Sequence, residues 1–259
     1  MSTLLLSDFA AAIAASKIKT IDLTQLLSAE TPALMLPPEF GQCVGFSSRE
    51  ISRYDERGVA WYWNEFTVNE HTGTHFDAPI HWITGRDLPN NAVDTISPKD
   101  FIAPAVVIDI VAKCATDPDY LLTVADIEAF EARHGRIQPG IWVLLRTDWS
   151  KRSPEDYVNR RDDGAHTPGP STEAVRFLID ERNAHGLGVE TIGTDAGQAH
   201  FLEPAYPAHT LFHGAGRYGL QCLANLDLLP PTGAVIIAAP LKIAGGSGSP
   251  LRVLALVEA

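Results

Sequence analysis

The segment that decides the fold and the chemistry of this chain is His71-Thr-Gly-Thr-His-Phe-Asp-Ala-Pro-Ile-His-Trp82. Three histidines and one aspartate fall within the eleven residues from His71 to His81. Imidazole nitrogens and carboxylate oxygens are donors that divalent metals such as Zn²⁺ and Mn²⁺ accept. The segment therefore predicts a metal site.

No regular element brings these donors to one ion. His71 and His75 would share a helix face, as in the zinc-protease helix motif, but Pro79 inside a helix costs about 3 kcal/mol. In a straight strand the donors share one face, yet at about 3.3 Å per residue His71 and His75 would lie about 13 Å apart. Two ligands that each bond one ion at about 2.1 Å cannot be so distant. We therefore expect a short strand that runs into a tight loop, with bends at Gly73 and Pro79.

The composition is that of a globular protein. The chain has 259 residues, of which 45% are hydrophobic and 20% charged, and its formal net charge is -12. This charge argues against nucleic acid or an anionic membrane surface as the main partner. No stretch approaches the roughly 18 apolar residues of a membrane span.

Cysteine usage and the N-terminal residues predict a cytoplasmic protein. Cys43, Cys114 and Cys222 form a sparse, odd set without CxxC spacing, which favours a reducing compartment and excludes a cysteine-built metal site. The first residues lack the basic region of a signal peptide, and Asp8 interrupts their apolar run. They instead predict a helix over about residues 5–16, a plausible dimer contact if it is exchanged between subunits. One face of that helix would carry Leu4, Leu5, Phe9 and Ile13.

Short apolar runs alternate with helical patterns along the rest of the chain, which indicates an α/β domain. The predicted strands are 105–111, 141–146, 188–193, 234–239 and 251–257. Helices are predicted over 123–134, with a cap at Thr123, and over 171–185, with Ser171 near the start and Gly186 as the stop. The charged, Pro- and Gly-bearing segment 150–170 is predicted to be a surface excursion.

Two further groups of residues are candidates for the same site. Polar groups gather between residues 195 and 225, namely Asp195, Gln198, His200, His209, His213 and Gln221. An aromatic group directly precedes the metal motif and consists of Trp61, Tyr62, Trp63 and Phe66. These rings would either pack in the core or form a flat apolar wall for a planar substrate.

The metal motif resembles that of the metal-dependent cyclase family, which includes bacterial kynurenine formamidases and isatin-hydrolysing enzymes. The resemblance extends over nearly the whole chain. Further matching stretches are Ile21-Asp-Leu-Thr24, Arg146-Thr-Asp-Trp-Ser150, Gly193-Thr-Asp195, Pro207-Ala-His209, Gln221-Cys-Leu-Ala-Asn-Leu226 and Gly245-Gly-Ser-Gly-Ser-Pro-Leu-Arg252. The fold that it implies is one α/β domain over residues 1–259, with a mixed, barrel-like sheet of the swivelling β/β/α type flanked by helices. Family members form dimers or larger oligomers, so a homodimer is expected.

The resemblance also implies roles for the motif. His71, His75 and Asp77 would bind the metal, and His81 would act as the acid and base. Formamidase-type members carry Glu at the position of Gln221, where the carboxylate helps to hold a second metal. An amide oxygen can coordinate but offers no charge against the repulsion of two dications. We therefore predict one ion per chain, with Gln221 as a further ligand; the oxygen-rich donor set favours Mn²⁺, with Zn²⁺ as the alternative.

The expected reaction is the opening of a cyclic amide such as isatin to isatinate by a metal-activated water, since the Gln221 variant resembles the isatin-hydrolysing members more closely. The residues expected around this small planar aromatic substrate are Trp63, Phe66, Trp82, His209 and His213. The alternatives are an arylformamidase that hydrolyses N-formylkynurenine to kynurenine and formate, hydrolysis of another cyclic amide, imide or lactone, and a non-catalytic protein that binds metal or a small molecule.

Overall fold

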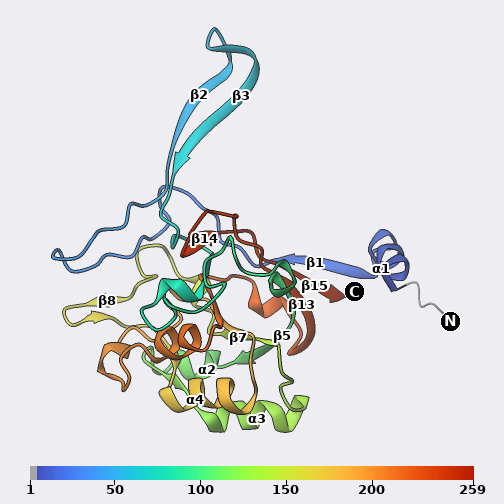
Figure 1. Cartoon of the computed structure of the whole chain (residues 1–259), viewed down its shortest axis with the longest axis vertical. Coiled ribbons are helices and arrows are strands. Elements are labelled where there is room, and N and C mark those ends of the chain that lie inside the picture. The colour runs from blue at the N-terminus through green and yellow to red at the C-terminus, as the bar shows by residue number, and fades with distance from the viewer. Residues whose placement is uncertain (1–4) are drawn as a thin grey trace.

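A curled sheet of nine strands runs through the protein, as a computed structural model of residues 5–259 shows (Figure 1). Its strand order is β1-β15-β13-β5-β7-β11-β12-β4-β14. The strands span β1 Ile18–Asp22, β4 His75–Asp77, β5 Ile102–Asp109, β7 Trp142–Arg146, β11 Gly186–Val189, β12 Tyr218–Gln221, β13 Thr232–Ile237, β14 Gly248–Pro250 and β15 Leu254–Glu258. The four central strands β5, β7, β11 and β12 are parallel, and the outer pairings are antiparallel. This confirms the predicted α/β fold with a mixed, barrel-like sheet.

Smaller elements complete the fold. Three two-stranded pieces pair β2 Ser47–Asp55 with β3 Gly58–Thr67, β6 Leu121–Leu122 with β10 Gly169–Pro170, and β8 Arg160–Arg161 with β9 Gly164–Ala165. The α-helices are α1 Leu5–Ala14, α2 Val111–Cys114, α3 Val124–His134 and α4 Thr172–Arg176. Two π-helices span η4 Phe177–Glu181 and η6 Ala208–His213. Short 3₁₀ turns span η1 Pro79–His81, η2 Pro98–Phe101, η3 Trp149–Lys151, η5 Ala199–Phe201 and η7 Leu226–Leu228.

Alternate residues of the central strands feed two separate cores, because successive side chains of a strand point to opposite faces. Val143 and Leu145 of β7 pack under α3 and α4, which lie together on one side of the sheet (Figure 1). Trp142 and Leu144 of the same strand face the other core with Phe76 of β4. The metal motif is thereby anchored in the second core.

All five predicted strands are confirmed, with shifted ends. The prediction 188–193 becomes β11, which starts at Gly186 and ends at Val189, and the prediction 251–257 becomes β15, which starts at Leu254. Helix α3 has the predicted cap. Thr123 Oγ1 accepts a hydrogen bond from Asp126 N (3.2 Å), and Asp126 Oδ2 accepts one from Thr123 N (2.9 Å).

Two boundaries were predicted wrongly. The helix predicted over 171–185 starts after the Ser171 cap, but its C-terminal part is π-helical and it ends at Glu181. Arg182 is the C-cap, and Asn183 takes a left-handed conformation (φ 49°). Gly186 therefore starts a strand and does not stop a helix. The segment 150–170 is only partly a surface excursion, because Tyr157 (3% exposed) is buried in it and accepts a bond from Trp149 Nε1 (2.7 Å) through its carbonyl oxygen.

Two elements leave the body of the chain. The β2–β3 hairpin projects as a long arm, and α1 lies beyond the end of β1 (Figure 1). No residue of α1 is buried, and Leu4 of its predicted apolar face lies outside the described residues. None of the helices in residues 5–259 has the length and apolar character needed to cross a membrane.

Candidate metal centre

Strand β4 places the metal motif between two glycines. Asp77 is in register with Gly219 of β12 on one side and with Gly248 of β14 on the other. His75, Phe76 and Asp77 are all buried. The predicted bends are confirmed: Gly73 has φ 63°, and Pro79 opens the 3₁₀ turn η1 that carries His81.

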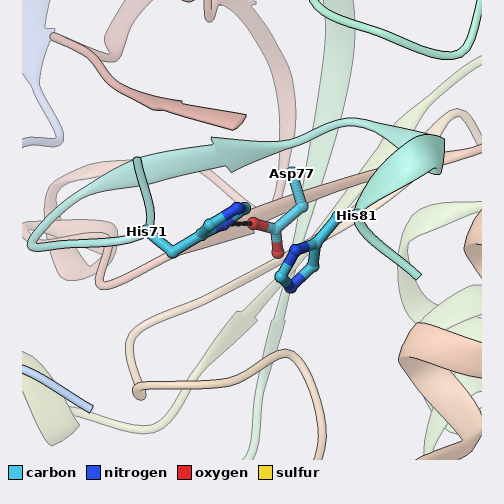
Figure 2. A group of neighbouring side chains, drawn as sticks. All are labelled: His71, Asp77 and His81. Atoms are coloured by element: carbon cyan, nitrogen blue, oxygen red, sulfur yellow. Dashed lines mark hydrogen bonds and ion pairs between the residues drawn. The ribbon is translucent and has the colours of Figure 1, made fainter. Parts of the chain in front are cut away.

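The side chains of His71 and His81 lie beside the carboxylate of Asp77 (Figure 2), and that of His75 is close to the same group. His71 Nδ1 lies 2.8 Å from Asp77 Oδ1, and His75 Nε2 lies 3.3 Å from the same oxygen. His75 Nδ1 donates to Gly73 O (2.7 Å), so its Nε2 keeps a lone pair. That nitrogen is buried and has no hydrogen-bond partner. Since buried polar atoms are normally paired, an unpaired imidazole nitrogen beside a carboxylate fits a divalent cation, with His71 exchanging its bond to Asp77 for the ion.

Asp77 remains a carboxylate in this setting. Burial by itself raises its pKa, but the neighbouring rings of His75 and His71 outweigh burial and hold the pKa of Asp77 well below its usual value. The site thus supplies a fixed negative charge against which a dication can bind.

His81 lies against His71, with the two rings stacked at 3.8 Å between centroids (Figure 2). One donor atom each from His71, Asp77 and His81 lies within 4.8 Å of the others. Burial lowers the pKa of His81 to about 3, although Asp77 pulls in the opposite direction. The ring is therefore neutral at pH 7 and has a lone pair for a proton.

Gln221 contacts the site differently from the predicted ligand. Because Gly193 N is a donor, the amide atom 2.6 Å away is the oxygen, Gln221 Oε1. The Nε2 group then faces Asp77 and donates to its Oδ2 at 2.5 Å. Coordination of an ion through Oε1 would require Gln221 to give up its bond to Gly193.

The π-helix η6 brings two further histidines close to Asp77. Donor atoms of Asp77, His209 and His213 lie within 4.8 Å of one another. His209 lies 4.8 Å from Trp82 and 5.7 Å from His81 between ring centroids. His213 is more deeply buried (1% exposed), and its Nε2 has no partner. His209, His213 and Trp82 thus lie together around the motif, as the sequence predicted.

Other candidates lie elsewhere. Trp63 and Phe66 are on the projecting hairpin, 55% and 62% exposed, and are not part of the group around Asp77 in their own chain. Gln198 donates to Ala165 O and contacts His166, and His200 is exposed beside Phe201. Trp63 and Phe66 have no metal-donor atom, and His200 belongs to neither group of possible metal donors in the described part of the chain.

Ser247 and Glu70 hold His71, and no pattern in the sequence predicts this role. Ser247 Oγ lies 2.8 Å from His71 Nε2 and donates to Glu70 Oε2 at 2.6 Å. The only signal was that Ser247 falls in the matched stretch at residues 245–252, which carried no assigned function.

Comparisons with known proteins identify relatives of the chain. A model of the family described as putative cyclase matches residues 21–196. The chain is 46% identical to isatin hydrolase of Roseibium aggregatum over 255 residues, 97% of each chain. The solved structure of isatin hydrolase A from Ralstonia solanacearum superimposes with a TM-score of 0.98 at 62% identity over all of both chains. Kynurenine formamidase of Salinibacter ruber is 30% identical over 212 residues, 76% of this chain and 87% of that one. The chain therefore belongs to the cyclase family.

Proposed function

We propose that this protein is a metal-dependent hydrolase that opens the lactam ring of isatin to isatinate. The observation that carries the proposal is the convergence of His71, His75 and His81 on the buried carboxylate of Asp77, in a chain 46% identical to an isatin hydrolase over 97% of its length. The kynurenine formamidase relatives are less similar.

The reaction adds water across the lactam C–N bond. His71, His75 and Asp77 would hold a divalent ion, and that ion would supply a water whose pKa is lowered from about 16 towards about 7. Neutral His81 takes the water proton as the oxygen bonds to the carbonyl carbon. The C–N bond then breaks, and His81 returns the proton to the leaving nitrogen, which gives an aminoaryl carboxylate. Trp82 and His209 flank His81 and would contact the planar substrate.

Ring-opening can be followed with purified, manganese-loaded protein. Mixing with isatin should change its absorbance, and mixing with N-formylkynurenine should leave that spectrum almost unchanged. Faster decay of N-formylkynurenine would replace the proposal with an arylformamidase. Turnover of neither compound would favour another cyclic amide or a non-catalytic binding protein.

We propose one Mn²⁺ per chain, with Zn²⁺ as the alternative metal. Supporting this stoichiometry, Gln221 brings no negative charge to Asp77 and instead donates a hydrogen bond to it. Metal analysis of the native protein should give about one ion per chain. A clear value of two would overturn the argument from Gln221.

We also propose that the protein is a homodimer held in part by α1 and the β2–β3 hairpin. An isolated two-stranded hairpin is marginally stable in water, and large exposed apolar patches mark interaction sites. The exposed apolar side chains on these two elements are Leu5, Leu6, Phe9, Ile13, Val59, Trp61, Trp63 and Phe66. Since the hairpin leaves its own body, Trp63 and Phe66 would line a substrate site only in a second copy.

Light scattering on the eluting protein should give twice the chain mass of 28.1 kDa. A monomer at micromolar concentration would overturn the dimer and the role of Trp63 and Phe66.

We also propose a reducing, cytoplasmic location, which the three free cysteines support.

A further inference from the structure

We propose that Asp195 is a positioning residue for the hydrolysis: it fixes the ring of His209 so that Nε2 is directed at the substrate beside His81 and Trp82. The inference rests on the proposed function of this site. It assigns Asp195 a role that the sequence motif and the metal donors do not.

The carboxylate of Asp195 is buried (4% exposed) and makes three bonds to one short segment. Its Oδ1 accepts from Ala208 N (2.6 Å), and its Oδ2 accepts from His209 N (3.0 Å). The third bond joins Oδ2 to His209 Nδ1 at 2.5 Å. The two backbone bonds fix the start of η6, and the third fixes the rotation of the imidazole within it.

The third bond also decides which ring nitrogen is free. A carboxylate can only accept, so His209 Nδ1 carries a proton. Nε2 is then the ring atom left to face the site, where His209 lies 4.8 Å from Trp82 and 5.7 Å from His81 between ring centroids. An aspartate that orients a histidine in this way is worth about 10⁴ in kcat in serine proteases.

Asp195 is itself tied to the metal centre through backbone. It lies two residues after Gly193, whose N–H donates to Gln221 Oε1 (2.6 Å), and Gln221 Nε2 donates to Asp77 Oδ2. The carboxylate that orients His209 and the carboxylate that faces the metal are thus held by one connected set of bonds. The spacing between metal donors and His209 Nε2 is fixed from both ends, which is the precision that positioning requires.

The first test replaces Asp195 by asparagine, which keeps the shape but turns one acceptor into a donor. Asp195→Asn should lower kcat for isatin at least about tenfold, with a smaller change in KM. The matched control is Asp163→Asn, which removes another aspartate–histidine bond (2.8 Å to His166 Nε2) outside the site. The control should keep wild-type kcat. Equal losses in both variants would overturn the positioning role.

A double-mutant cycle separates positioning from support of the fold. In a His209→Gln background, Asp195→Asn should change kcat less than about twofold, because the ring that Asp195 positions is gone. Additive losses would mean that Asp195 only caps η6, and would overturn the proposal.

A spectroscopic measurement keeps the proposal falsifiable if the variants do not fold. In ¹⁵N-histidine spectra of the wild-type, zinc-loaded protein, His209 should carry a proton on Nδ1. A His209 with Nδ1 unprotonated would overturn the proposal. This measurement needs no substrate, so it tests the orientation of His209 independently of the proposed function. If the wild-type protein leaves isatin intact, the proposed function is wrong, and the spectrum still decides the orientation of His209.

Discussion

Strands β4 and β3 are opposites in length and burial. β4 has three residues, all buried between two neighbouring strands, and it carries His75 and Asp77. β3 has ten residues, of which only Gly58 is buried, and its single partner is β2. The predicted metal ligands are therefore carried by the strand that the sheet surrounds on both sides. The longer element has its apolar side chains exposed, and in the proposed homodimer a second copy would cover them.

The largest loss of turnover should come from a substitution in the metal motif that continues from buried β4. His81→Ala should lower kcat by about 10² to 10⁴, the usual contribution of a general base, while the metal content of the protein stays unchanged. The control His134→Ala removes an exposed histidine of α3 and should leave turnover intact. Metal loss in His81→Ala would instead make His81 a ligand.

Substitutions in the exposed strand β3 should lower turnover less. The double variant Trp63→Ala/Phe66→Ala should lower kcat/KM for isatin at least about tenfold, since each tenfold step corresponds to about 1.4 kcal/mol of lost contact. The metal content should not change, because the side chains of tryptophan and phenylalanine offer no ligand atom to a divalent ion.

Co-expression of that variant with His81→Ala sharpens the test. If the hairpin serves a second copy, a mixed dimer has one site with both His81 and an intact hairpin. Activity should then return to about a quarter of the wild-type value, since half of randomly formed twofold dimers are mixed and each has one complete site. Activity no higher than that of the separate variants would show that each hairpin serves its own chain.

The smallest effect on turnover should come from a buried ion pair remote from both elements. Arg182 Nε and Nη2 bind both carboxylate oxygens of Glu131 at 2.6 and 2.8 Å, and hydrogen bonding to Arg182 lowers the pKa of Glu131. A carboxyl group whose pKa is lower in the folded state stabilises the protein at pH values above its unfolded-state pKa. This stabilisation is lost as the pH falls through the folded-state pKa. Glu131→Gln should thus cost about 3 kcal/mol of unfolding free energy at pH 7. The cost should be much smaller once the pH has fallen below the lowered folded-state pKa of Glu131, and kcat should be unchanged. An equal cost at both pH values would contradict this role of the pair.

The sequence could predict elements whose signal is local. The apolar runs of β5 and β7, the Thr123 cap of α3, and the bends at Gly73 and Pro79 all follow from neighbouring residues. These local signals, together with the cyclase resemblance, were sufficient to place the metal motif.

The remaining features depend on contacts that no local pattern encodes. An aromatic run such as Trp61–Trp63 has the same composition whether it packs in a core or projects on a hairpin, so its exposure could not be derived. The π-helical turns of η4 and η6 differ from an α-helix in backbone hydrogen bonding, which the residue types do not reveal. The bond from Ser247 to His71 joins residues 176 positions apart.

The glycines on either side of Asp77 have a consequence for how this site tolerates mutation. A Cβ atom at Gly248 would lie 2.5 Å from His71 Cε1, and one at Gly219 would lie 2.9 Å from Asp77 Oδ2. Neither distance leaves room for a methyl group, so even alanine would push the ring or the carboxylate out of place. Two positions without any functional group should therefore be as intolerant to substitution as the histidines. In a saturation-mutagenesis map, Gly219 and Gly248 should be as sensitive as the predicted ligands, because the absence of a Cβ at these positions leaves room for Asp77 and His71.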